Sequence, residues 1–327
     1  MTRPLRVVFL VETAATAGMG HLRRVVPLAE ALRERGAACS FSLTDPVRAS
    51  LVESAGFPVG PWDPTDPEAV AGHDVVVIDG YTHPQGLLEG WAGRAVRVLV
   101  DDLATRPQEA EIVVNHNLYA DDCDYSDYRA DRVLRGPRHT IVARAFRALR
   151  DRPAPDVPRI LVSFGGTDRG EFALPATRAL RRVAPDTPVS VALMEAAPGV
   201  RDELAAAGAD IHVGRPLEEV MDGCSLLVGA AGLTVSEASA AGLAVVACSI
   251  ADNQRRYVPA GQRLGLTIRE GFDPEWLAAA VKGLLEGDLV RTRSPLVDGW
   301  GAERIADEIV AAVRSRRTIE QTGVDAS

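Results

Sequence analysis

The chain has few cysteines and no long hydrophobic run. Its 327 residues include four cysteines, which are widely spaced and form no Cys-x-x-Cys pair. We therefore predict reduced core thiols rather than a disulfide framework or a zinc site. No apolar stretch is long enough to cross a bilayer, and Glu12 interrupts the run Val7–Val11 with no cleavage pattern after it. We expect a cytoplasmic protein without membrane insertion.

The chain also has fewer basic than acidic residues, with 36 Lys and Arg against 45 Asp and Glu. The formal net charge is −9 at pH 7 and the isoelectric point is about 5.3. This balance argues against a broad surface for nucleic acid or for anionic membranes, although it is compatible with a local site for one diphosphate. The composition, with 46% hydrophobic and 25% charged residues, is typical of a globular protein, and the length fits two domains better than one.

Short strand-like runs alternate with helical patterns along the chain. The first half has predicted strands at Val7–Val11, Ala38–Leu43, Asp74–Ile78 and Val96–Val100, with helices at Val47–Ala55 and Pro84–Gly93. The second half has predicted strands at Arg159–Phe164, Val189–Leu193, Ile211–Val213, Leu226–Val228 and Leu243–Cys248. Such alternation predicts an α/β fold with parallel strands and crossover helices, one sheet in each half.

Three prolines within residues 151–158 disfavour helix and predict a semi-rigid linker. We therefore predict an N-terminal Rossmann-like domain over residues 1–150 and a C-terminal Rossmann-like domain over residues 151–315. A helical pattern over Gly301–Arg314 is expected to pack back across both domains. Residues 316–327 lack apolar periodicity and are predicted to be a flexible, frayed tail.

A glycine loop follows the first predicted strand and opens an amphipathic helix, with Arg24 assigned to its polar face. Backbone amides and the dipole at such a helix start attract phosphate, which makes Gly18 and Gly20 candidate ligand contacts and His21 a candidate catalytic group. A lone histidine here also fits a polar cap. The motif is neither a Walker loop nor a complete dinucleotide fingerprint.

The second half contains a comparable strand, small-residue loop and helix start. Gly232, Leu233 and Thr234 expose backbone donors suited to a diphosphate. Glu237 follows one turn later, where it is placed to accept hydrogen bonds from two ribose hydroxyls. Thr234 and Glu237 also fit a capping box, and the two roles can coexist.

Other loops after predicted strands carry glycines and polar residues. Ligands of open parallel sheets bind beyond the carboxyl ends of the strands, so these loops are candidate contacts, although each one alone also fits an ordinary turn. They are Asp79-Gly80-Tyr81, Asp101-Asp102, Gly165-Gly166-Thr167-Asp168 and Asp252-Asn253-Gln254. From this set and the strand end at Val213, we assign Gly165, Gly166, Val213 and Gln254 to ligand binding.

Metal-dependent glycosyl transfer is an alternative interpretation of the acidic residues in the sequence. Asp122-Cys123-Asp124 spells an Asp-x-Asp pattern and Asp101-Asp102 is a second acidic pair. The first lies in a polar stretch typical of a solvated surface. The remaining histidines, His73, His83, His116, His139 and His212, show no metal-ligand spacing. We expect no metal site and no cofactor.

Taken in order, these segments resemble the UDP-sugar hydrolases of the pseudaminic acid pathway, relatives of the spore-coat glycosyltransferase-like proteins and of the peptidoglycan N-acetylglucosaminyltransferase. The segments that carry the resemblance are Gly18–Arg23, Asp79–Tyr81, Asp101–Leu103, Asn115–Asn117, Ser163–Asp168, Gly229–Glu237 and Asn253-Gln254. The resemblance implies a GT-B fold, in which two Rossmann-like domains with parallel sheets face a central cleft. It also implies that the second domain holds most of the nucleotide.

The resemblance further implies roles for single residues. His21 is similar to the family's catalytic base, Tyr81 to its active-site tyrosine, Asn253 to its cleft asparagine and Glu237 to its ribose-binding acid. The implied reaction is metal-independent hydrolysis of a nucleotide-diphosphate sugar, foremost a UDP-linked amino or deoxy sugar. It cleaves the anomeric C–O bond and releases free sugar and nucleoside diphosphate.

Two alternatives use the same parts. A GT-B glycosyltransferase replaces water by the hydroxyl of a small-molecule acceptor, and a nucleotide-sugar sensor binds without chemistry. The chain departs from the hydrolase pattern at Val11-Glu12-Thr13, where an Arg and an Asp are usual, and at Ser236, where a Trp is usual. Both departures concern the sugar and its acceptor. The sequence does not indicate an oligomeric state.

Overall fold

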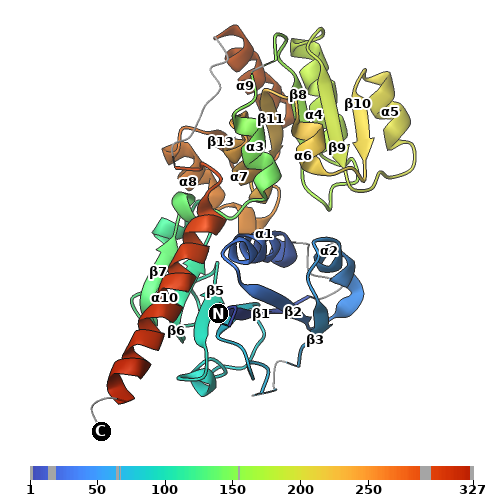
Figure 1. The fold of residues 1–327 in the computed structure, drawn as a ribbon. Coiled ribbons are helices and arrows are strands. Elements are labelled where there is room, and N and C mark those ends of the chain that lie inside the picture. The colour runs from blue at the N-terminus through green and yellow to red at the C-terminus, as the bar shows by residue number, and fades with distance from the viewer. Residues whose placement is uncertain are drawn as a thin grey trace. The chain divides into compact units, whose positions relative to one another are not determined.

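The computed structural model describes residues 3–13, 20–63, 66, 68–153, 155–287 and 296–324. The chain divides into two compact units (Figure 1). Unit 1 comprises Met1–Ile141 and Trp300–Ser327, and unit 2 comprises Val142–Gly299. Each unit is an α/β layer structure built on its own parallel sheet.

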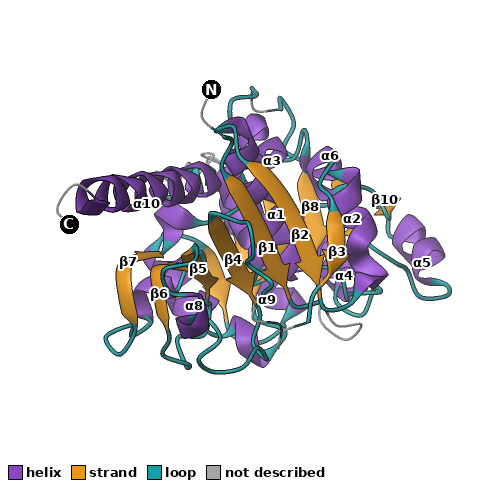
Figure 2. Ribbon diagram, turned by 60° about the horizontal axis from the view of Figure 1, so that its bottom comes forward, coloured by secondary structure: helices purple, strands orange, loops and turns teal. Residues whose placement is uncertain are grey.

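Unit 1 contains a seven-stranded sheet in the order β3-β2-β1-β4-β5-β6-β7 (Figure 2). The strands are β1 (Arg6–Val11), β2 (Ala38–Leu43), β3 (Val59–Pro61), β4 (Val75–Asp79), β5 (Val96–Val100), β6 (Glu109–Asn115) and β7 (Arg129–Arg135). All neighbouring pairs are parallel. The central strands β4 and β5 are buried along their whole length, in keeping with their mostly apolar sequences. The buried Arg97 of β5 is paired with Glu111 of β6.

Helices from both ends of the chain cover one face of this sheet. They are α1 (Gly20–Glu34), α2 (Ala49–Ser54) and α10 (Gly301–Val324). Unit 1 also contains short 3-10 turns at η1 (Pro46–Arg48), η2 (Glu89–Trp91), η3 (Ala120–Asp122) and η4 (Pro137–His139). Val25 and Leu28 of α1 share a buried core with Ile305 and Ile309 of α10. Figure 1 shows α10, in red, beside strands from the first part of the chain.

Unit 2 contains a six-stranded sheet in the order β10-β9-β8-β11-β12-β13, again parallel throughout. The strands are β8 (Ile160–Ser163), β9 (Val189–Leu193), β10 (Asp210–Val213), β11 (Leu226–Ala230), β12 (Ala244–Cys248) and β13 (Thr267–Arg269). The helices are α3 (Arg144–Arg150), α4 (Ala173–Val183), α5 (Val200–Ala206), α6 (Leu217–Met221), α7 (Leu233–Ala240), α8 (Tyr257–Arg263) and α9 (Pro274–Glu286), with η5 at Asp252–Gln254.

Each strand predicted from the sequence is present, with its ends shifted by at most two residues. Four strands were not predicted: β3 and β13 have only three residues each, β7 is rich in charge, and β6 begins with polar residues. The helix predicted over Pro84–Gly93 is wrong. Gly86 and Gly93 adopt positive φ angles of 84° and 74°, which an α-helix excludes, and the segment forms turns and η2.

The limits of the two units differ from the predicted domains. Residues 142–150, including α3, join unit 2, and the proline-containing segment lies inside that unit, where Arg152 forms an ion pair with Asp222. The C-terminal helix joins the core of unit 1. It continues to Val324, so most of the predicted tail is helical.

Candidate functional site

The predicted site residues of unit 1 gather where the strand order of its sheet reverses. From β1 the chain proceeds to β2 on one side, whereas β4 lies on the other side. In such sheets, ligands usually bind beyond the carboxyl ends of the strands at this switch point, here β1 and β4. Helix α1 brings His21 to this edge, and the loop after β4 brings Tyr81.

His21 forms a short hydrogen bond with a buried carboxylate. Its Nδ1 lies 2.6 Å from Oδ1 of Asp79, the last residue of β4. The Asp79 side chain is fully buried and that of His21 is 13% exposed. Arg24 Nη2 also lies 2.9 Å from Nδ1, but it donates to Asp79 Oδ1 at the shorter distance of 2.5 Å. An ionised carboxylate only accepts hydrogen bonds, so we assign the proton to Nδ1 and, in the neutral ring, a lone pair to Nε2. The pair therefore has the arrangement of a general base held by an acid.

Arg24 connects this pair to a second carboxylate. Its Nε donates to Asp79 Oδ2 and its Nη1 donates to Asp102 Oδ2, each at 2.6 Å. Arg24 is only 5% exposed, so its assignment to the polar face of the helix is wrong. Burial alone would raise the pKa of Asp79, but the charges and hydrogen bonds of Arg24 and His21 outweigh burial and hold that pKa well below its usual range.

Tyr81 completes the network. Its hydroxyl donates to both oxygens of Asp102, at 2.7 and 2.9 Å, and its ring meets the His21 ring edge-on at a centroid distance of 5.1 Å. Burial raises the pKa of the Tyr81 hydroxyl and the neighbouring Asp102 adds to the rise, against the opposing charge of Arg24. The phenol therefore stays protonated at neutral pH.

The loop that carries Tyr81 is fixed from two sides. Glu12, directly after β1, accepts hydrogen bonds from the backbone amides of Tyr81 and Thr82, both at 2.6 Å. A side chain at Gly80 would overlap the Glu12 side chain, so this approach requires glycine. Arg106 donates to the carbonyl oxygens of Tyr81 and His83. Glu12 thus has a structural function at the position where the chain departs from the hydrolase pattern.

Asp101 and Asp102, which follow β5, make different contacts. Asp101 is internal to its own loop, because its Oδ1 accepts the amides of Leu103 and Ala104 and its Oδ2 accepts the Tyr128 hydroxyl. Asp102 belongs to the His21 network. From the sequence, Asp79 and Asp102 were named only as parts of candidate loops after predicted strands, and Arg24 was not considered as a site residue.

His116 lies buried beside this network. Burial, with a contribution from Arg24, lowers its pKa to about 4, so its ring is neutral near pH 7. Among the described residues, no group of three or more His, Cys, Asp or Glu side chains is placed to hold a metal ion. In the Asp-x-Asp pattern, Asp124 accepts the Ser126 amide in a local turn. The four cysteines are free thiols.

In unit 2 the predicted ligand residues also lie at a strand-order reversal, between β8 and β11. Gly165 and Gly166 follow β8, and Gly165 has a φ of 94°. Gly232 is the N-cap of α7 and no side chain caps that helix, so the predicted capping box between Thr234 and Glu237 is not formed. The first-turn amides of Leu233 and Thr234 start at the edge where ligands bind.

The remaining predicted contacts of unit 2 are spread along the same edge. Glu237 lies one turn into α7 and is 5% exposed. Val213 ends β10, and η5 after β12 carries exposed Asn253. Gln254 accepts the Ile250 amide at 2.9 Å, which gives it a local structural role. In unit 1, Gly20 is the first residue of α1, whereas Gly18 lies outside the described residues.

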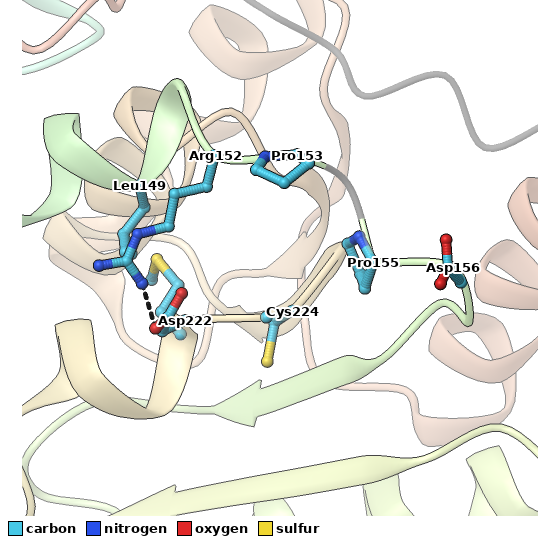
Figure 3. Close-up of a pocket in the computed structure, with 9 residues that line it drawn as sticks. Leu149, Arg152, Pro153, Pro155, Asp156, Asp222 and Cys224 are labelled. Carbon is cyan, nitrogen blue, oxygen red and sulfur yellow. Dashed lines mark ion pairs between the residues drawn. The ribbon is translucent and has the colours of Figure 1, made fainter.

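Cavities of unit 2 lie at both edges of its sheet. One of about 410 Å³ lies at the amino ends of the strands, opposite to Gly165 and Gly232, and Figure 3 shows the Arg152–Asp222 ion pair beside it. Cys224 forms part of its wall, and burial raises the pKa of that thiol to about 12, so it is unreactive. Another cavity, of about 380 Å³, adjoins η5 and is lined in part by Phe172 and Phe272. The second cavity is at the predicted ligand edge.

The comparisons with known proteins show the fold. No family model matches the chain, and no curated protein matches its sequence. The fold is similar to that of a glycosyltransferase of kitacinnamycin, with a TM-score of 0.67, 16% identity and coverage of 95% of this chain and 100% of that one. The fold is also similar to that of a calicheamicin glycosyltransferase, with a TM-score of 0.64, 17% identity and coverage of 96% of this chain and 99% of that one.

A third similar structure is a putative UDP-N-acetylglucosamine 2-epimerase from Listeria monocytogenes, with a TM-score of 0.62, 18% identity and coverage of 97% of each chain. At these identities the likeness shows the fold alone. The fold is that of the GT-B glycosyltransferases, as predicted, with two α/β units on parallel sheets. No helix among residues 3–13, 20–63, 68–153, 155–287 and 296–324 has the length and apolar character needed to cross a membrane.

Proposed function

We propose that this protein transfers a glycosyl group from a nucleotide-diphosphate sugar to a hydroxyl of a small-molecule acceptor. The observation that carries the proposal is the His21–Asp79 pair at the switch point of unit 1, which leaves Nε2 of His21 as a base. Similar folds belong to structures named as glycosyltransferases, which favours transfer over the hydrolysis implied by the sequence resemblance.

In the proposed reaction, the acceptor oxygen forms a bond to the anomeric carbon while the bond from that carbon to the diphosphate oxygen breaks. The electron pair of the broken bond leaves with the diphosphate, and the acceptor proton passes to His21 Nε2. Asp79 keeps the imidazole in its tautomer and stabilises the imidazolium that forms. Tyr81 orients the sugar or the acceptor.

Unit 2 supplies the nucleotide contacts in this proposal. The amides of Gly232, Leu233 and Thr234 bind the diphosphate and stabilise its developing charge without a metal ion. Glu237 binds the ribose hydroxyls, and Asn253 positions sugar or phosphate. UDP is the proposed nucleotide, in line with the UDP-sugar in the name of one similar structure. The free cysteines fit work in the reducing cytoplasm.

The test is to incubate the protein with UDP-N-acetylglucosamine, UDP-glucose and a dTDP-linked deoxy sugar, each with and without a panel of hydroxyl acceptors. We expect release of nucleoside diphosphate that depends on acceptor and is unchanged by a chelator. Release with water alone would establish a hydrolase instead. Saturable binding without any product would establish a sensor.

A further inference from the structure

Arg24 determines which groups of the unit 1 site donate hydrogen bonds and which accept them. A guanidinium carries donors only, so each oxygen that Arg24 contacts on Asp79 and Asp102 must be an acceptor. Burial would raise the pKa of both carboxyls, but Arg24 holds both values below their usual range. Both groups are therefore carboxylates at neutral pH, and neither has a proton to donate.

The bridging protons must then come from the two rings. His21 Nδ1 lies 2.6 Å from Asp79 Oδ1 and 2.9 Å from Arg24 Nη2. Because Arg24 Nη2 donates to Asp79 Oδ1 over the shorter distance of 2.5 Å, we assign the proton between His21 and Asp79 to Nδ1. At 2.7 Å from Asp102 Oδ1, the Tyr81 hydroxyl directs its only proton to that carboxylate. Each ring therefore donates its proton to a carboxylate of the protein, His21 to Asp79 and Tyr81 to Asp102. Any further hydrogen bond that either ring makes uses a lone pair.

The two rings are also held together. Their centroids are 5.1 Å apart, and the Tyr81 backbone is fixed by Glu12 on one side and Arg106 on the other. A single small molecule can therefore meet both rings at once, and Tyr81 cannot turn its hydroxyl away without breaking its bonds to Asp102.

We propose that His21 and Tyr81 each accept a hydrogen bond from the molecule that receives the glycosyl group. The preferred molecule therefore carries two neighbouring hydrogen-bond donors. One is the reacting hydroxyl, directed to His21 Nε2, and the other is an adjacent hydroxyl or amino group, directed to the Tyr81 oxygen. A vicinal diol, as in a sugar or another polyol, has this chemistry. The inference rests on the proposed transfer reaction and adds the class of acceptor.

The tautomer can be measured without any activity. Nitrogen-15 labelled histidine in the full chain, observed by NMR at pH 8, should show His21 protonated at Nδ1, with the signal assigned by its loss in His21→Gln. In Asp79→Asn, the preference for that tautomer should weaken. A His21 ring protonated at Nε2 in the wild type would overturn the inference whatever the reaction.

The acceptor class is tested with three matched probes: trans-1,2-cyclohexanediol, cyclohexanol and trans-2-methoxycyclohexanol. With the nucleotide sugar that gives most release, we expect kcat/KM for the diol to exceed that for the other two by about fivefold, the effect of one hydrogen bond. Tyr81→Phe should remove this preference. Tyr119→Phe is the control, because its hydroxyl donates to the backbone carbonyl of Asp102 and leaves the carboxylate unchanged.

The Asp102→Asn variant should remove or reverse the preference for the diol over the methyl ether. Arg24 Nη1 should hold the amide oxygen, which turns the amide NH2 toward Tyr81 and frees the phenol proton for the ligand. The methyl ether should then be used as well as or better than the diol. A wild-type enzyme that uses the ether as well as the diol, or an Asp102→Asn variant with unchanged preference, would contradict the inference. The predicted tautomer without acceptor-dependent release would support the polarity and refute transfer.

Discussion

At the scale of single residues, one buried arginine organises the site of unit 1. Arg24 contacts two carboxylates, and these bind the His21 and Tyr81 rings. Removing one partner of such a group leaves a buried charge without its full compensation, which is costly. Replacing a ring that only meets the substrate should affect chemistry and leave folding intact. The two kinds of substitution therefore have different expected signatures.

His21→Ala should lower kcat by about 10²- to 10⁴-fold, the usual contribution of a general base. Binding of UDP, measured by calorimetry, should remain close to that of the wild type, because the proposed nucleotide contacts lie in unit 2. His139→Ala is the control, since His139 bonds only a local carbonyl in the described contacts. Equal loss of binding and turnover would make His21 a folding or binding residue.

Asp79 should make stability fall at acid pH. Its pKa is depressed in the folded state, so its stabilisation is complete above the ordinary value of 3.8 and is lost as pH falls below that value. Asp79→Asn should lower the free energy of unfolding at pH 7 by about 3–5 kcal/mol and flatten this pH dependence. Urea unfolding between pH 3 and 7 measures both, with exposed Asp127→Asn as control.

At the scale of elements, one glycine in each unit lies against a contact that leaves no space for a side chain. Glu12 after β1 reaches the loop after β4 across Gly80. In unit 2, Gly229 of β11 faces the carbonyl of Ser163 in β8, where a Cβ would overlap the backbone. Close strand packing at the switch points thus sets where the following loops begin.

Gly80→Ala should destabilise the protein by about 1–3 kcal/mol, because the new methyl group displaces Glu12. The displacement should also release the Tyr81 loop and lower kcat/KM. Gly90→Ala is the matched control, since no neighbouring atom lies within contact of a Cβ there. Thermal unfolding together with acceptor-dependent release measures the two effects. Equal stability of the two variants would refute the proposed clamp.

At the scale of the whole molecule, each unit has its own core, and unit 1 is built from both ends of the chain. Ile309 of α10 is fully buried in the core of unit 1, and Leu204 is fully buried in the core of unit 2. A cavity made at either position should therefore weaken a different set of strands.

Ile309→Ala should destabilise unit 1 by about 2–5 kcal/mol. In hydrogen exchange, amides of β1 and β4 should lose protection more than those of β8 and β11. Leu204→Ala should give the opposite pattern and serves as the matched variant. Uniform loss of protection in both variants would show that the two units unfold together.

The sequence predicted most of the strands because their residues are mostly apolar, and it predicted the starts of α1 and α7 from short glycine-containing motifs. It missed β7, whose charged residues resemble a loop, and it misassigned Pro84–Gly93, where two left-handed glycines interrupt a helical pattern. His21 and Tyr81 were predicted as site residues from their positions after strands and from the family resemblance, and they lie beside each other in the structure. Arg24 was missed because a helix-face pattern does not show which neighbour a charged side chain meets.

The α/β class, nine of the strands and the starts of α1 and α7 were therefore determined by the sequence alone, since they depend on residues close together in the chain. The assignment of α10 to unit 1 and the network that joins His21 to Tyr81 were decided only by the tertiary structure. Each depends on packing or charge pairing between residues that are distant in the chain, and local pattern contains no information about such partners.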